Sequence, residues 1–196
     1  MSIAEKIEPL TIEEYIRLYE LTPPFEIING ERREIMPPVA LHGLILRALF
    51  RLLDTYCIAN KLGEVVMEMP FVLTYDSGWV KGALVPELLF FAAARWDTYT
   101  AKTPDWPDKP FLLAPDLVAE IVSPNDLYSE IQDKVDRYLA VGVKLIWIID
   151  PQRRRVVVYT TGHYALLGAT DTLTGGDFLP GFSVALGELF QAAQVE

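Results

Sequence analysis

Two almost wholly apolar runs, residues 83–91 (ALVPELLFF) and 117–123 (LVAEIVS), most constrain how this chain can fold. Runs of this length and composition are typical of β-strands that are buried on both faces, as in the sheet of an α/β protein. Each run nevertheless contains one carboxylate, Glu87 in the first and Glu120 in the second. Burying an unpaired polar group costs roughly 2–7 kcal/mol, and an unpaired charge more. We therefore expect a charged partner or a metal ion to compensate these two side chains.

The other elements follow from periodicity and turn residues. Apolar spacing and capping residues predict helices over residues 11–21, 39–60 and 126–141. The pair Asn29-Gly30 predicts a β-hairpin near the N-terminus. Further strands are predicted over residues 64–75, 144–150 and 155–161, the last two joined by a turn with the sequence PQRR.

Residues 92–114, which are rich in Pro, Trp and Asp, are expected to form a loop or lid. The order of helices and strands predicts an α/β (α+β) fold with a mixed central β-sheet flanked by helices, preceded by an N-terminal helix and β-hairpin. The length of 196 residues predicts one domain over residues 1–196. Within it we expect an N-terminal helix and hairpin at 1–38, a core at 39–161 and a C-terminal extension at 162–196.

Composition narrows the class of protein. Hydrophobic residues make up 51% of the chain, more than one small core needs, so we expect a homodimer, the commonest closed assembly. The single cysteine excludes an internal disulfide framework, and no signal peptide or apolar run of membrane-spanning length occurs in the sequence. These features predict a cytoplasmic protein without a membrane anchor.

The formal net charge of −10 argues against strong nonspecific binding to nucleic acids, which depends on Lys and Arg side chains that neutralise phosphates. Despite the net negative charge, the sequence contains two short basic clusters, Arg32–Arg33 and Arg153–Arg155. The interpretation that we favour for both is a solvated turn or strand edge that aids solubility.

The spacing of the acids indicates which of them could share a cation. Asp116 and Glu120 lie on one face of a strand but four residues apart, about 13 Å, so they cannot hold one ion together. Glu87, on another buried run, is the better partner for Glu120. Two carboxylates that converge at one edge of a sheet suit a hard, oxygen-preferring cation such as Mg²⁺ or Mn²⁺.

Lys134 borders the apolar stripe of the predicted helix at 126–141. Its methylene stem could cover the core while the ammonium group stays in solvent. Alternatively, the ammonium group could reach Glu120 or a reacting phosphate. The sequence leaves both interpretations open.

The run LVAEIVSPND, followed by the helix with Lys134 and by YLAVGVKLIWIIDP, resembles the Uma2 family of endonuclease-like proteins, formerly a domain of unknown function. This family belongs to the PD-(D/E)XK, or restriction-endonuclease-like, superfamily. The likeness extends from FEIINGE through LHG and VPELLFF to FLPGFSVALGELF. It implies a mixed sheet flanked by helices, in which acids from adjacent strands bind divalent metal and a lysine supports the attacking water.

Matched position by position, the resemblance assigns roles to five residues. Glu87 takes the place of the family's Pro-Asp acid and Glu120 that of the second acid, and both would bind Mg²⁺ or Mn²⁺. Val122 occupies the usual lysine position, and Lys134 takes over the role of that lysine. Glu26 and His42 match an acid near the first strand and a histidine on the first core helix, and either could position water or a second metal. An exposed hairpin residue at Glu26 and a structural histidine at 42 remain alternatives.

The resemblance implies a DNA endonuclease that hydrolyses phosphodiester bonds. The chain departs from the family pattern by having Glu87 where Asp is preferred, Leu84 and Val85 where a basic residue is common, and Leu41 where an acid often precedes the histidine. These departures and the acidic charge favour an alternative, a catalytically impaired protein that acts as an interaction or regulatory module. A third interpretation is a small-molecule binder that uses the aromatic residues Trp96, Tyr99 and Trp106.

Overall fold

The computed structural model describes residues 4–74, 78–124 and 126–191. Two sheets dominate the architecture, and the larger has six strands in the order β11-β10-β9-β8-β7-β4. Strands β8 and β9 are parallel and all other neighbours in this sheet are antiparallel, so the sheet is mixed as predicted. The strands are β4 (Gly63–Met67), β7 (Leu88–Ala92), β8 (Leu117–Ile121), β9 (Leu145–Asp150), β10 (Arg155–Thr160) and β11 (His163–Leu167).

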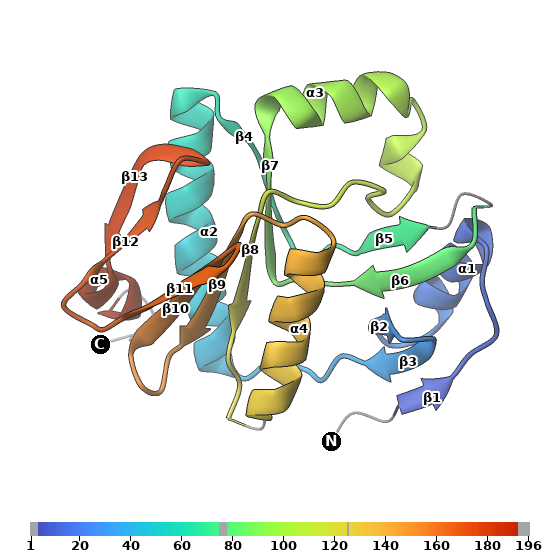
Figure 1. Ribbon diagram of the computed structural model, residues 1–196, viewed down its shortest axis with the longest axis horizontal. Helices are drawn as coiled ribbons and strands as arrows, with labels where there is room; N and C mark the ends of the chain where they lie inside the picture. Colours follow the sequence, from blue (N-terminus) through green and yellow to red (C-terminus); the bar gives the residue numbers. More distant parts are fainter. Residues whose placement is uncertain (1–3, 75–77, 125, 192–196) are drawn as a thin grey trace.

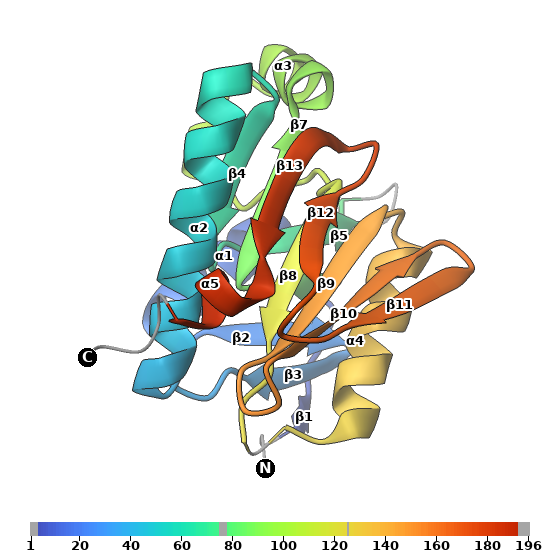
Figure 2. The same ribbon diagram turned by 90° about the vertical axis from the view of Figure 1, so that its left-hand side faces the viewer.

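Helices cover both faces of this sheet (Figures 1 and 2). One face packs against α2 (Ala40–Asn60), α5 (Leu186–Gln191) and the hairpin of β12 (Thr172–Gly175) and β13 (Leu179–Ala185). The opposite face packs against α4 (Tyr128–Ala140). Strands β8 and β9 are buried along their whole length, which explains why their sequences are almost continuously apolar.

The smaller sheet has five strands in the order β1-β3-β2-β6-β5. They are β1 (Ala4–Lys6), β3 (Glu31–Glu34), β2 (Phe25–Ile28), β6 (Val80–Leu84) and β5 (Phe71–Thr74). Helix α1 (Ile12–Leu21) packs on this sheet through Tyr15 and begins with a capping box formed by Thr11 and Glu14. Asn29 and Gly30 both have positive φ angles and form the two-residue turn between β2 and β3, as predicted.

Two predicted strands are each divided in two. The run 83–91 does not form one strand: it contains the end of β6 and most of β7, separated by Val85, Pro86 and Glu87. The predicted strand at 64–75 likewise divides into β4 and β5, and the interruption ends at Pro70. Proline lacks the N–H group that a strand interior needs, and at both points the chain passes from one sheet to the other.

The prediction that residues 92–114 form a loop or lid was wrong for half of the segment. Helix α3 (Ala93–Lys102) follows β7 directly, and a short 3₁₀-helix, η1, spans Trp106–Asp108. Trp96 contacts Trp106, with 5.0 Å between ring centroids, and also packs on Phe91. These aromatic side chains therefore cover the core. The third interpretation had assigned them to ligand binding.

Gly63 shows why β4 begins where it does. Its φ of 143° is unfavourable for other residues, and an added Cβ would lie 1.9 Å from the carbonyl oxygen of Phe91 on β7. Glycine therefore permits the end of α2 to lead into β4 in close contact with β7. Among the described residues, no helix combines the length and apolar character that crossing a lipid bilayer requires.

Candidate active site

Glu87 and Glu120 meet where the two sheets join. Glu120 lies near the C-terminal end of β8, and Glu87 directly precedes β7. The antiparallel register pairs Leu88 with Ala119. The residue before Leu88, Glu87, therefore stands opposite the residue after Ala119, Glu120. Oε2 of Glu87 also accepts a hydrogen bond of 2.8 Å from the backbone N–H of Ile121. The division of the run 83–91 at Pro86 thus places Glu87 at the sheet edge beside Glu120.

Lys134 reaches this site from α4. Its Nζ lies 3.3 Å from Oε1 and 3.4 Å from Oε2 of Glu120. The same atom lies 3.3 Å from Oε1 of Glu26 on β2. Of the two interpretations that the sequence left open, the structure shows the one in which the ammonium group points to Glu120.

Glu26 is buried rather than exposed on the hairpin. Besides Lys134, its Oε1 accepts a hydrogen bond of 3.1 Å from the backbone N–H of Val85, in the segment between β6 and β7. A third carboxylate therefore stands beside Lys134 and ties β2 to the segment that carries Glu87.

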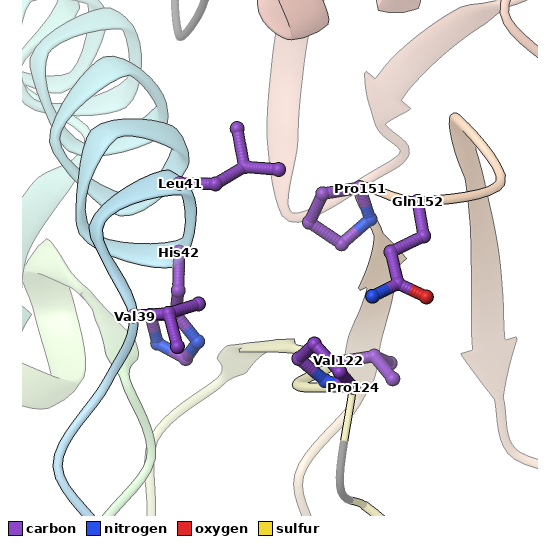
Figure 3. A pocket seen from close by; sticks show the side chains of 7 residues that line it. All are labelled: Val39, Leu41, His42, Val122, Pro124, Pro151 and Gln152. Carbon is purple, nitrogen blue, oxygen red and sulfur yellow. The ribbon is translucent and has the colours of Figure 1, made fainter.

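His42 lies between Glu87 and a small surface pocket. It lies in the first turn of α2, and its Nε2 is 2.9 Å from Oε1 of Glu87. A pocket of about 30 Å³ opens beside it (Figure 3). The pocket is lined by Val39, Leu41 and His42 from the start of α2, by Val122 and Pro124 after β8, and by Pro151 and Gln152 after β9. Its lining is mostly apolar, so the Glu87–His42 pair has little competition from solvent.

Burial shifts the titration of the acids. Burial is the largest influence on Glu120 and raises its pKa to about 7; Lys134 opposes this shift, while Glu87 and Glu26 add to it. Burial also raises the pKa of Glu87, against the opposing hydrogen bond from His42. Both carboxyl groups are therefore harder to ionise than in water, and a bound cation would favour their charged forms.

The pKa values of the two basic side chains of the site, Lys134 and His42, are shifted towards their charged forms. Burial acts against the charge of Lys134, but Glu120, Glu26 and Glu87 together outweigh it and raise its pKa. Burial likewise disfavours charged His42, and the hydrogen bond and charge of Glu87 outweigh it, so its pKa is also raised. Lys134 is therefore a fixed ammonium group at neutral pH and not a proton acceptor.

Tyr138 also belongs to the site, although the sequence analysis singled out only Lys134 on this helix. Its hydroxyl donates a hydrogen bond to Oε1 of Glu120, and its side chain is fully buried. The signal in the sequence was its position four residues after Lys134, which places both on one face of α4. Asp116 lies elsewhere, as expected, and pairs with Arg95 at 2.6 Å.

The donor set is consistent with a hard divalent cation. Glu87 and Glu120 offer carboxylate oxygens only, the ligands that Mg²⁺ and Mn²⁺ prefer. Within residues 4–74, 78–124 and 126–191, no cluster of three or more His, Cys, Asp or Glu side chains forms a metal site by itself. Mg²⁺ is commonly held by one or two carboxylates and completed by water and substrate phosphate, so two glutamates suffice.

Comparison with known proteins places the chain in a family. The model of the Uma2 family, described as "Putative restriction endonuclease", matches residues 12–187. A solved structure described as "a putative nuclease belonging to DUF820 from Anabaena variabilis ATCC 29413" has a TM-score of 0.75 and 21% identity, and the match covers 95% of this chain and 100% of that one. None of the curated proteins compared matches the chain. The structural likeness shows the shared fold, and the family match extends over nearly the whole sequence. This protein therefore belongs to the Uma2 family.

Proposed function

We propose that this protein is a metal-dependent endonuclease that hydrolyses phosphodiester bonds in DNA. The observation that carries the proposal is the meeting of Glu87, Glu120 and Lys134 at one sheet edge. The family description and the name of the Anabaena variabilis structure support a nuclease in general.

Each residue has a distinct part in this proposal. Glu87 and Glu120 would hold Mg²⁺ or Mn²⁺, which when bound acidifies a water molecule and stabilises negative charge on the phosphoryl oxygens. Lys134 orients the Glu120 carboxylate and, as a fixed ammonium group, stabilises the charge that develops on the phosphate. His42 and Glu26 act as positioning residues, since they hydrogen-bond to Glu87 and to the backbone of Val85.

The experiment is cleavage of supercoiled plasmid in Mg²⁺ and in Mn²⁺ by the wild type and by two variants. Glu120→Gln removes a metal-binding charge, and Lys134→Met removes the ammonium group while keeping the apolar stem. We expect each variant to lower the cleavage rate on the order of 10²–10³-fold, the usual effect of removing one transition-state stabiliser.

Matched controls separate this role from a general effect of charge. Glu188 and Lys144 are exposed, and Lys144 precedes β9 at the end of the strand opposite the site. Glu188→Gln and Lys144→Met should leave cleavage unchanged. If the wild type and Glu120→Gln leave the plasmid equally intact across metals, the proposal fails.

A second candidate is a catalytically impaired protein that serves as an interaction or regulatory module. It is favoured by one specific observation: Glu120 is already paired with both Lys134 and Tyr138. A metal ion would have to share this carboxylate with two donors. Absence of Mn²⁺ binding in calorimetry would support this candidate. The predicted homodimer is tested separately by sedimentation over a concentration series.

A further inference from the structure

The turn between β9 and β10 concentrates positive charge. Of the three arginines Arg153–Arg155, the first and the third pair with one carboxylate, that of the buried Asp150. Its Oδ2 lies 3.2 Å from Nη1 of Arg153 and 3.3 Å from Nε of Arg155. Three guanidinium groups against one carboxylate leave an excess of two positive charges in the turn.

The other basic cluster of the sequence is neutralised where it stands. Arg32 pairs with Glu34 at 2.9 Å, and Arg33 pairs with Glu31 at 3.4 Å, all within β3. Each arginine of that pair therefore has a carboxylate of its own. In a chain with net charge −10, an uncompensated basic turn is unlike its surroundings.

The turn borders the candidate active site. Because β8 and β9 are parallel, Glu120 and Asp150 lie towards the same edge of the sheet. Pro151 and Gln152 of the turn line the same pocket as His42, whose imidazole holds Glu87 (Figure 3). The three arginines follow these two residues directly in the sequence, in the same turn.

The backbone of the turn is fixed in a strained form. Arg154 has a φ of 50°, in the left-handed region that costs residues other than glycine about 1–2 kcal/mol. Asp150 secures the turn by accepting a hydrogen bond of 3.0 Å from the N–H of Arg153. Arg154 itself makes no ion pair or side-chain hydrogen bond with any residue that the structure describes.

We propose that this turn is a phosphate-binding site, in which Arg153 and Arg154 contact the nucleic-acid backbone next to the phosphodiester bond that is cleaved. The side chain of Arg153 is 63% exposed, and Arg155 can keep Asp150 paired while Arg153 binds phosphate. This inference rests on the proposed nuclease function. It would give an acidic protein a local positive charge for a polyanion, at the end of the sheet that carries the acids.

The test compares the double variant Arg153→Gln/Arg154→Gln with the control Lys61→Gln. Lys61 is also a basic residue with a left-handed backbone, φ 55°, and is exposed. It follows the 21-residue helix α2 at the end remote from His42, roughly 28 Å away at 1.5 Å per residue. Both variants remove positive charge from a strained position, but only one does so beside the site.

The measurement is the affinity for a short fluorescent DNA duplex as a function of salt, with Ca²⁺ in place of Mg²⁺. A single-stranded oligonucleotide of the same sequence forms a parallel series, and thermal melts establish that the variants fold. The slope of log K against log salt is about −0.9 per phosphate contact on duplex DNA and about −0.7 on single strands. We expect the double variant to have a slope shallower by about 1.8 on duplex, and an affinity lower on the order of tenfold or more near 0.1 M salt.

The outcomes separate the two proposals. Equal slopes for the wild type and the double variant, with nucleic acid still bound, overturn the phosphate-binding turn and leave the nuclease proposal standing. An equal change in slope per charge removed in Lys61→Gln also overturns it, since the effect would then be one of overall charge. If the wild type neither binds nor cleaves DNA of either form, both proposals are wrong.

Discussion

The hydroxyl of Tyr138 donates a hydrogen bond to the carboxylate of Glu120 although neither side chain is freely exposed to water. This bond favours the charged form of Glu120, against the burial that raises the pKa of the carboxyl group. Tyr138 also connects α4 to the end of β8, so the helix that carries Lys134 and the strand that carries Glu120 are held in one arrangement.

Tyr138→Phe should therefore raise the pKa of Glu120 above its value of about 7 and lower the free energy of unfolding. A hydrogen bond to a charged group contributes roughly 1.5–3 kcal/mol, and this contribution should diminish below pH 6, where Glu120 is protonated. Denaturant titrations at pH 6 and pH 8 measure the change, and the acid limb of the pH–rate profile should shift to higher pH. The control is Tyr164→Phe, which alters an exposed tyrosine on β11. An unchanged acid limb would contradict the positioning role.

Glu120→Gln should remove a pH dependence of stability in the metal-free protein. The pKa of Glu120 is raised by burial from 4.5 to about 7 in the folded state, so between these values the folded chain binds more protons than the unfolded chain. The free energy of unfolding must then fall as the pH rises from about 4.5 to about 7, by roughly 3 kcal/mol at most. The variant has no such carboxyl group. In the presence of a chelator, its free energy of unfolding should therefore rise relative to that of the wild type between pH 5 and pH 8. Parallel curves for both proteins would refute the raised pKa, and Glu188→Gln serves as the exposed control.

His42→Gln should lower stability more at pH 6 than at pH 9. The pKa of His42 is raised in the folded state because its pairing with Glu87 outweighs burial. Its contribution is therefore fully present below the unfolded value of 6.5 and is lost as the pH rises through the folded pKa. We expect the loss of unfolding free energy caused by the substitution to differ on the order of 1–2 kcal/mol between the two pH values, measured by thermal or urea unfolding. The other histidine, His163, is exposed on β11, and His163→Gln should show no such difference.

Mn²⁺ should stabilise the wild type and not the variant Glu87→Gln. A ligand that binds only the folded state raises its stability by about 2.7 kcal/mol at a concentration of 100 times Kd. Because the cation competes with protons for the carboxylates, the increase in Tm should be larger at pH 8 than at pH 5.5. Calorimetric titration measures the affinity directly, with Glu64→Gln, an exposed acid on β4, as the control. Equal Tm increases in the wild type and Glu87→Gln would exclude Glu87 as a ligand.

Local sequence signals predicted the elements that depend on local chemistry. Thr11 and the acids after it marked the start of α1, Asn29-Gly30 marked the hairpin, and the apolar stripe of α4 gave each of its ends to within two residues. The apolar runs around Glu120 and before Asp150 predicted buried strands, and both form the centre of the larger sheet. These signals suffice because capping, turn geometry and amphipathic periodicity act over a few neighbouring residues.

The boundary between the two sheets was not predictable in this way. The run 83–91 is apolar on both sides of Pro86, so its composition does not reveal that β6 and β7 belong to different sheets. The helix α3 was missed because its segment, with aromatic and β-branched residues, has weak helical propensity and is stabilised by packing of Trp96 on Phe91.

The sequence by itself identified Glu87 and Glu120 as carboxylates within apolar runs that require compensation, and it left open whether Lys134 points to them. Only the tertiary structure decided their partners. Glu26 comes from β2, Glu87 from the segment before β7 and Glu120 from β8, and Tyr138 and His42 come from two helices on opposite faces of the larger sheet. Distances between such residues depend on how the strands pair and on which face each helix packs, and these are properties of the assembled core rather than of any local stretch of chain.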